Sequence, residues 1–131
     1  MPDCILVVDD DELTRSAICA HVEKLGYRAI EAGNGIEAIE EIGKGNLHGM
    51  ILDILMPQSD GIEVLVWIMK EQLTLPVVVF TQTGVDRRLS YPEIAERFGA
   101  IKSFEKPISE KNIRKAMELI EAAHDEQASS S

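Results

Sequence analysis

Carboxylates stand at the ends of two apolar runs that lie far apart in the sequence. The run 4–8 passes directly into Asp9 and Asp10, and the run 48–52 passes directly into Asp53. Three carboxylates that come together repel one another unless a cation lies between them. Oxygen ligands with spare positions for water suit Mg²⁺. We therefore predict a magnesium site if folding brings the ends of these two runs together.

A hydroxyl and an ammonium group follow two other apolar runs. Thr81 closes the β-prone run 77–80, and Lys106 comes shortly after the run 101–104. Next to a metal and carboxylates, these two groups would form a cradle for a phosphoryl group, because phosphoryl transfer needs mainly positioning and charge neutralisation. A carboxylate that is not wholly committed to the metal can then act as the nucleophile.

The elements that position these residues alternate regularly along the chain. Continuous apolar runs favour strands that are covered on both faces, as in a parallel sheet, and the segments between them repeat their apolar residues at helical spacing. The sequence therefore predicts an α/β fold, a doubly wound parallel sheet of five strands with helices on both faces. The predicted strands are 4–8, 28–32, 48–52, 77–80 and 101–104, and the predicted helices are 13–25, 34–42, 62–70, 92–99 and a last one after Ser109.

Such sheets carry their function at the carboxyl ends of the strands, near the switch in strand order. The predicted reactive residues all fall at those ends. We expect a single domain over residues 1–126, followed by a disordered tail at 127–131.

Composition restricts the class of protein and its surroundings. The 131 residues suit one globular core, and no apolar run approaches the length of a membrane span. The start of the chain has no basic region typical of a signal peptide, and Cys4 and Cys19 show no metal or redox spacing. We therefore expect a cytoplasmic protein that does not bind membranes.

Charge is distributed unevenly over the chain. The net charge of −10 argues against broad nucleic-acid binding, so we expect no nucleic-acid partner. The segment 87–115, however, holds eight Lys/Arg and four Asp/Glu, a net charge of +4. Such a segment is either a solvated face or a docking surface for a less basic or acidic partner.

Four motifs taken together resemble the response-regulator receiver family, over essentially the whole chain. They appear in the family's order and on the predicted strand ends: Val7-Val8-Asp9-Asp10-Asp11, Leu52-Asp53-Ile54-Leu55-Met56-Pro57-Gln58-Ser59-Asp60-Gly61, Val79-Phe80-Thr81 and Lys106-Pro107. The resemblance implies a flavodoxin-like sheet with strand order 2-1-3-4-5. It also implies a chemotaxis-regulator-like domain of a two-component signalling system.

The resemblance assigns roles to particular residues. The phosphoacceptor would be the aspartate that opens the Asp-x-x-Met-Pro-x-x-Asp-Gly motif, here Asp53. A Mg²⁺ ion would be held by the side chains of Asp9, Asp10 and Asp53 and by the backbone carbonyl of Leu55. Thr81 and Lys106 would bind phosphoryl oxygens, and the bond between Lys106 and Pro107 would be cis.

The implied function is that of a single-domain response regulator. A histidine kinase, a histidine phosphotransfer protein or a small acyl phosphate would supply the phosphoryl group. Phosphorylation would reshape the face made by the fourth helix, fifth strand and last helix, where a downstream protein would bind. The chain would be a signalling switch that assists its own phosphorylation and dephosphorylation rather than an enzyme, and a monomer or weak dimer. The sequence leaves open whether the chain is complete or was cut from a longer regulator.

Three departures from the family pattern concern the switch. Gln82 stands where the residue after the switch threonine is usually small, and Ser103 occupies the usual place of the switch aromatic. Phe104, one residue later, is expected on the opposite face of its strand, in the core. The stretch between Thr81 and the fifth strand is long, and Tyr91 within it is a candidate substitute for the switch aromatic.

Two other functions compete with this reading. A haloacid-dehalogenase-type phosphohydrolase would use Asp9 as its nucleophile, but the threonine expected four residues later is Leu13, and a late Gly-Asp motif is missing. A receiver-like interaction module that works without phosphorylation is the second alternative. The departures at Gln82 and Ser103 favour such a module, and the intact acidic set argues against it.

Overall fold

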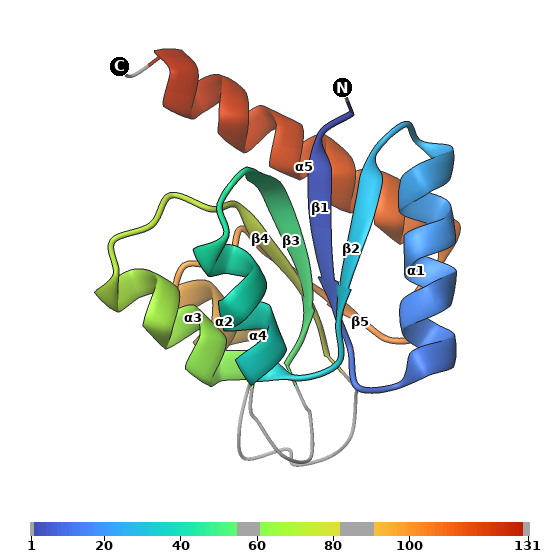
Figure 1. The fold of residues 1–131 in the computed structure, drawn as a ribbon, viewed down its shortest axis with the longest axis horizontal. Helices are drawn as coiled ribbons and strands as arrows, with labels where there is room; N and C mark the ends of the chain where they lie inside the picture. The colour runs from blue at the N-terminus through green and yellow to red at the C-terminus, as the bar shows by residue number, and fades with distance from the viewer. Residues whose placement is uncertain (1, 55–60, 82–90, 130–131) are drawn as a thin grey trace.

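A computed structural model describes residues 2–54, 61–81 and 91–129. Strands and helices alternate along the described chain (Figure 1). The strands are β1 (Cys4–Val8), β2 (Arg28–Ala32), β3 (Leu47–Asp53), β4 (Val77–Thr81) and β5 (Lys102–Glu105), and the helices are α1 (Glu12–Lys24), α2 (Gly35–Gly43), α3 (Gly61–Lys70), α4 (Tyr91–Arg97) and α5 (Glu110–Ser129).

All five strands pair in parallel in one sheet, in the order β2-β1-β3-β4-β5. The predicted fold class and strand order are therefore confirmed. The register places Val8 of β1 beside Leu52 of β3, and Asp53 beside Phe80 of β4. The carboxyl ends of these three neighbouring strands thus lie level at one edge of the sheet.

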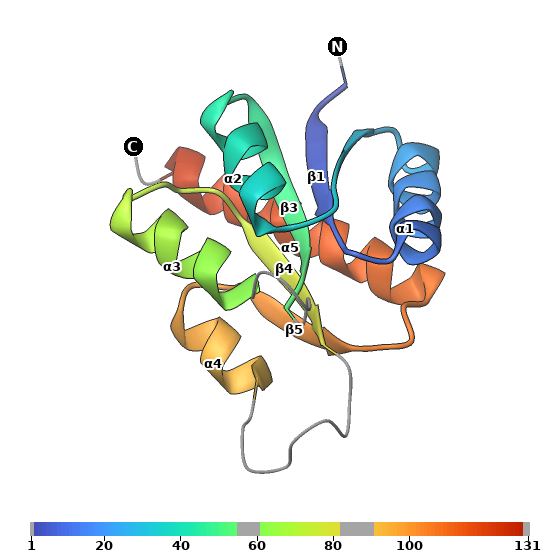
Figure 2. The same cartoon turned by 60° about the horizontal axis from the view of Figure 1, so that its bottom comes forward.

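Helices cover both faces of the sheet, with α2, α3 and α4 on one face and α1 and α5 on the other, and a separate core lies on each face (Figure 2). Leu6 and Val8 of β1 pack with residues of α2, α3 and α4, whereas Ile5 and Val7 pack with residues of α1 and α5. This alternation explains the unbroken apolar run, because a strand with helices on both faces buries every side chain.

Local signals at the helix ends agree with the structure. The side chains of Asp11 and Asn34 accept hydrogen bonds from the backbone N–H groups of Thr14 and Glu37 at the starts of α1 and α2. Ser109 accepts one from the N–H of Asn112 at 3.1 Å at the start of α5. Gly26, with φ +97°, follows the last turn of α1 in the left-handed conformation that glycine favours.

Apolar spacing in the sequence predicts that Leu13 and Leu25 lie on the inner face of α1 and Met69 on that of α3, and the structure corrects these predictions. Leu13 and Leu25 share the helical spacing of the buried residues of α1, yet they are 82% and 39% exposed. On α3 the predicted inward residue Met69 is exposed, and Val64 and Ile68 are buried instead. These helices bury fewer apolar residues than their spacing indicates, and packing against the sheet determines which of those residues are buried.

The last helix is longer than the sequence pattern indicates. α5 continues to Ser129, so it extends into the segment 127–131 for which we predict a disordered tail. The side-chain amide of Gln127 donates a hydrogen bond of 2.9 Å to the carbonyl of Thr74, which ties this last turn to the loop before β4. Within the described residues, no helix combines the length and apolar character that crossing a membrane requires.

Candidate functional site

The three predicted carboxylates meet at the carboxyl edge of the sheet. Asp9 and Asp10 follow β1, and Asp53 ends β3, the next strand in the sheet. One oxygen from each lies within 4.8 Å of the other two. Asp9 is fully buried and Asp53 is 4% exposed, whereas Asp10 is exposed. The arrangement therefore combines two buried charges with one that faces solvent.

Lys106 reaches this cluster from the end of β5. Its Nζ lies 3.3 Å from Asp9 Oδ2 and 3.2 Å from Asp53 Oδ2. Although burial by itself disfavours the ammonium, the neighbouring Asp53 and Asp9 carboxylates outweigh it and raise the pKa of Lys106 above its usual value. Lys106 is therefore fully charged at neutral pH. The bond from Lys106 to Pro107 is cis.

Thr81 ends β4, between β3 and β5 in the sheet, and is 2% exposed. Its carbonyl accepts a hydrogen bond of 2.8 Å from the N–H of Lys106. Asp53 pairs in register with Phe80, so Thr81 lies one residue beyond the level of the predicted phosphoacceptor. The backbone thus brings the predicted hydroxyl and ammonium residues to the same edge as the acids.

Backbone contacts fix the acidic loop after β1. Asp9 donates its N–H to the carbonyl of Ala32, and Asp9 Oδ1 accepts the N–H of Asp11 at 2.9 Å. Arg15 of α1 donates from Nη1 to the carbonyl of Asp9 at 2.8 Å and from Nε to Glu31 of β2 at 3.0 Å. Arg15 is a residue that the sequence analysis missed, because its partner at the site is a main-chain carbonyl, which leaves no signature in the sequence.

A close backbone approach also shapes the floor of the site. A Cβ added to Gly61, at the start of α3, would lie 2.6 Å from the carbonyl oxygen of Asp53. The N–H of Gly61 donates to the carbonyl of Ile54 at 2.8 Å. The glycine that ends the Asp53 motif therefore allows α3 to begin directly against the end of β3.

Some predicted residues lie outside the described part of the chain. These are Leu55, the proposed carbonyl ligand, Gln82 and the side chain of Tyr91, whose backbone opens α4. Phe104 is half-buried and packs against the core on the α1 and α5 face, with its ring centroid 5.5 Å from that of Phe80. The prediction that Phe104 is a core residue is confirmed.

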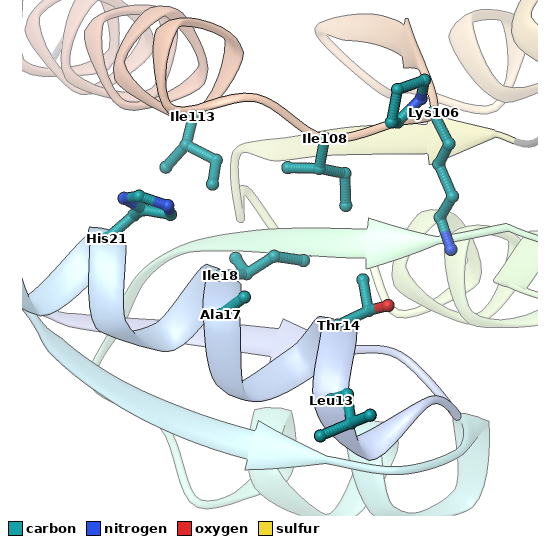
Figure 3. A pocket seen from close by; sticks show the side chains of 9 residues that line it. Leu13, Thr14, Ala17, Ile18, His21, Lys106, Ile108 and Ile113 are labelled. Atoms are coloured by element: carbon teal, nitrogen blue, oxygen red, sulfur yellow. The ribbon is translucent and has the colours of Figure 1, made fainter.

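A groove opens beside Lys106, between α1 and the segment that leads into α5 (Figure 3). Thr14 and Ile18 of α1 form one wall, and Ile108 and Ile113 form the other, with Lys106 at one end. The lining is largely apolar, and exposed Leu13 stands at its rim. The groove is thus next to the acidic cluster, because Lys106 both lines the groove and contacts Asp9 and Asp53.

Comparisons with known proteins identify a family and several relatives that this chain resembles. The family described as the response regulator receiver domain matches residues 5–118. The response regulator RR06 of Streptococcus pneumoniae serotype 2 is 39% identical over 80 residues, which cover 61% of this chain and 36% of that protein. The transcriptional regulatory protein ResD of Bacillus subtilis is also 39% identical over 80 residues, 61% of this chain and 33% of that protein. The chain therefore spans about a third of the length of the curated relatives it matches.

Solved structures share the whole fold. A response regulator receiver domain protein from Clostridium thermocellum superposes with a TM-score of 0.83 over 98% of both chains, at 23% identity. NtrX from Brucella abortus gives a TM-score of 0.87 at 27% identity, over 99% of this chain and 29% of that one.

The fold and the site together define a doubly wound α/β protein with an acidic, lysine-containing pocket at the carboxyl edge of its sheet. The chain belongs to the response regulator receiver domain family. It is thus a receiver domain of two-component signalling. Membership in this family favours a receiver function over that of a dehalogenase-type hydrolase.

Proposed function

We propose that this receiver domain accepts a phosphoryl group on Asp53 with Mg²⁺ bound beside it, and that it acts as a switch rather than as an enzyme with a separate substrate. The observation that carries the proposal is the position of the Lys106 ammonium, 3.2 Å from Asp53 Oδ2 and 3.3 Å from Asp9 Oδ2. A fixed cation shared by two buried carboxylates lies where a transferred phosphoryl group would place its negative oxygens.

The donor set fits magnesium. Three carboxylates against one ammonium leave two negative charges in a largely buried cluster, and the ligands on offer are all oxygens. Asp9, Asp10 and Asp53 would hold the ion, together with the carbonyl of Leu55, which lies outside the described residues. When bound, the ion supplies positive charge that screens the oxygens of the transferring group.

In the transfer step, an oxygen of the Asp53 carboxylate attacks the phosphorus of the donor. A P–O bond to Asp53 forms while the donor's P–N bond, in a phosphohistidine, or P–O bond, in an acyl phosphate, breaks. The electron pair leaves with the imidazole or the carboxylate of the donor, and Lys106 screens the charge that develops on the phosphoryl oxygens. The Thr81 hydroxyl, at the end of the neighbouring strand, would then donate to one of these oxygens.

The output would follow from that last hydrogen bond. Drawing in the end of β4 biases an existing equilibrium between two arrangements of the α4, β5 and α5 face. A useful switch needs a bias of a few kcal/mol, roughly two or three charge-assisted hydrogen bonds. The donor would be a histidine kinase or a histidine phosphotransfer protein, and the output would be a protein that binds this face of a monomer or weak dimer.

Labelling with acetyl phosphate and Mg²⁺ tests the proposal. We expect one phosphoryl group per wild-type chain and none after Asp53→Asn or in the presence of a chelator, measured by intact mass and by peptide mapping. Asp125→Asn, an exposed carboxylate on α5, is the matched control and should label like the wild type. Label on Asp9 would instead support the hydrolase. A chain that never labels would support the interaction module that works without phosphorylation.

A further inference from the structure

A second cluster of ligating side chains lies at the opposite, amino-terminal edge of the sheet. Asp3 precedes β1, His48 is the second residue of β3, and Glu121 and His124 come from α5. One ligating atom each from Asp3, His48 and Glu121 lies within 4.8 Å of the others. The sequence does not reveal this cluster, because its members lie far apart along the chain and show no ligand spacing.

The hydrogen bonds of Glu121 fix the proton on the His48 ring. Glu121 Oε1 accepts the Tyr27 hydroxyl at 2.6 Å and lies 2.6 Å from His48 Nε2. A glutamate side chain is ordinarily a carboxylate at neutral pH, and a carboxylate can only accept hydrogen bonds. A neutral His48 must therefore carry its proton on Nε2, which leaves the lone pair on Nδ1.

Another acceptor lies near that nitrogen. His48 Nδ1 lies 3.7 Å from Asp3 Oδ2, so in the neutral ring two electron-pair donors lie on either side of this gap. Ligands that each stand about 2.0–2.2 Å from one ion can lie up to about 4 Å apart, so the gap has the width that a shared cation requires. Histidines that bind a metal through one ring nitrogen usually donate a hydrogen bond from the other to a carboxylate, and Glu121 is placed to accept such a bond from His48 Nε2.

The His48 ring is also held in place from its face. The His124 ring stacks on it with the centroids 3.8 Å apart and the planes 5° apart, and His124 Nε2 hydrogen-bonds the His48 carbonyl oxygen. Only 15% of the His48 side chain is exposed, against 61% for Asp3. The ring is thus a fixed ligand, and the exposed Asp3 side chain can adjust to an ion.

The gap opens into a surface hollow that leaves room for water ligands. Asp3, Cys4, His48 and His124 line it, together with Arg28, whose charge opposes the binding of a cation. We propose that Asp3 Oδ2 and His48 Nδ1 are ligands of a borderline divalent cation of the Zn²⁺ class, with water completing its shell. An imidazole ligand favours Zn²⁺ over Mg²⁺, and two protein ligands beside an arginine make the site weak.

Calorimetric titration of the full chain with ZnCl₂, in excess Mg²⁺ that competes for the acidic pocket, tests the site. We expect one zinc ion per wild-type chain to bind with a heat that is lost in Asp3→Asn and in His48→Gln. Glu121→Gln, which removes only the orienting carboxylate charge, should weaken binding by about tenfold. His21→Gln, on α1, is the matched control and should bind like the wild type.

Asp3→Asn keeps the test decisive if His48→Gln fails to fold, because Asp3 lies at the exposed start of the chain. Equal zinc binding by the wild type and Asp3→Asn would overturn the proposal, as would a loss of binding in Cys4→Ser alone. A nitrogen NMR spectrum that shows a proton on His48 Nδ1 at pH 7.5 in the presence of zinc would also overturn it.

Discussion

At the residue scale, the charge balance of the acidic pocket depends on Lys106. Its ammonium contacts two buried carboxylates and keeps 23% of its side chain exposed. Replacing it by glutamine leaves Asp9 and Asp53 to repel each other. We expect Lys106→Gln to lower the free energy of unfolding by about 2 kcal/mol in a chelator, less than for a fully buried pair because solvent reaches Lys106.

Magnesium should restore most of that loss, because a divalent cation replaces the missing charge. Urea unfolding with EDTA and with Mg²⁺ measures both values. Lys102→Gln, exposed at the start of β5, is the control and should show neither effect. A loss of stability that is the same with and without Mg²⁺ would contradict the expectation.

Arg15 acts on the same pocket through the main chain. Its guanidinium joins the Asp9 carbonyl to Glu31, so it sets the orientation of the peptide that leads to Asp10. We expect Arg15→Ala to weaken Mg²⁺ binding several-fold, since a first ligand shell loses affinity when its support is removed. Calorimetric titration measures this, and Arg114→Ala, an exposed arginine on α5, is the control. Unchanged affinity in a folded Arg15→Ala protein would show that the carbonyl contact has no part in positioning the acids.

At the element scale, α5 packs on β3 through a position without a side chain. A Cβ added to Gly49 would lie 2.6 Å from Cγ2 of Ile120, a branched carbon with little freedom to move. We expect Gly49→Ala to destabilise the fold by about 1–3 kcal/mol, because overpacking forces the helix outward. Thermal or urea unfolding measures the change. Gly43→Ala, where an added Cβ meets nothing within 4 Å, should cost nothing.

The contact between α5 and the start of β3 also responds to acid. The hydrogen bond from Tyr27, helped by His48, lowers the pKa of Glu121 below its usual 4.5. Below pH 4.5 the unfolded chain binds a proton at Glu121 more readily than the folded chain, so the stability that this group contributes is lost as the pH falls. We expect Tyr27→Phe to lose less stability than the wild type between pH 7 and pH 4. Urea unfolding in EDTA measures it, and parallel pH profiles would contradict it.

At the scale of the whole molecule, positive charge is concentrated in one segment of an acidic chain. The segment 87–115 carries +4 in a chain of net charge −10, and its described part includes β5 and the start of α5. If the segment 87–115 binds a partner of opposite charge, added salt screens the attraction between them. We expect the dissociation constant of the phosphorylated chain and its target protein to rise several-fold between low and high salt. A constant that is insensitive to salt would contradict a docking role for this segment.

Much of the fold could be predicted because local rules and global packing agree here. The five strands appear within a residue or two of their predicted ends, since runs such as Ile5–Val8 are apolar on both faces only in a covered sheet. The edge of the sheet at which Asp9, Asp53, Thr81 and Lys106 meet could likewise be predicted, because parallel strands put their carboxyl ends together.

The sequence by itself therefore determined the class of fold and the composition of the acidic pocket, because both depend on the order of apolar runs and on the residue that ends each run. Only the tertiary structure decided which stripe of α1 is buried, with Leu13 left in solvent, and which distant residues became neighbours. Arg15 with the Asp9 carbonyl, and His48 with Asp3 and Glu121, are pairings of this kind. These pairings depend on how the helices lie against the sheet. Many weak packing contacts determine that arrangement, and no local sequence pattern predicts it.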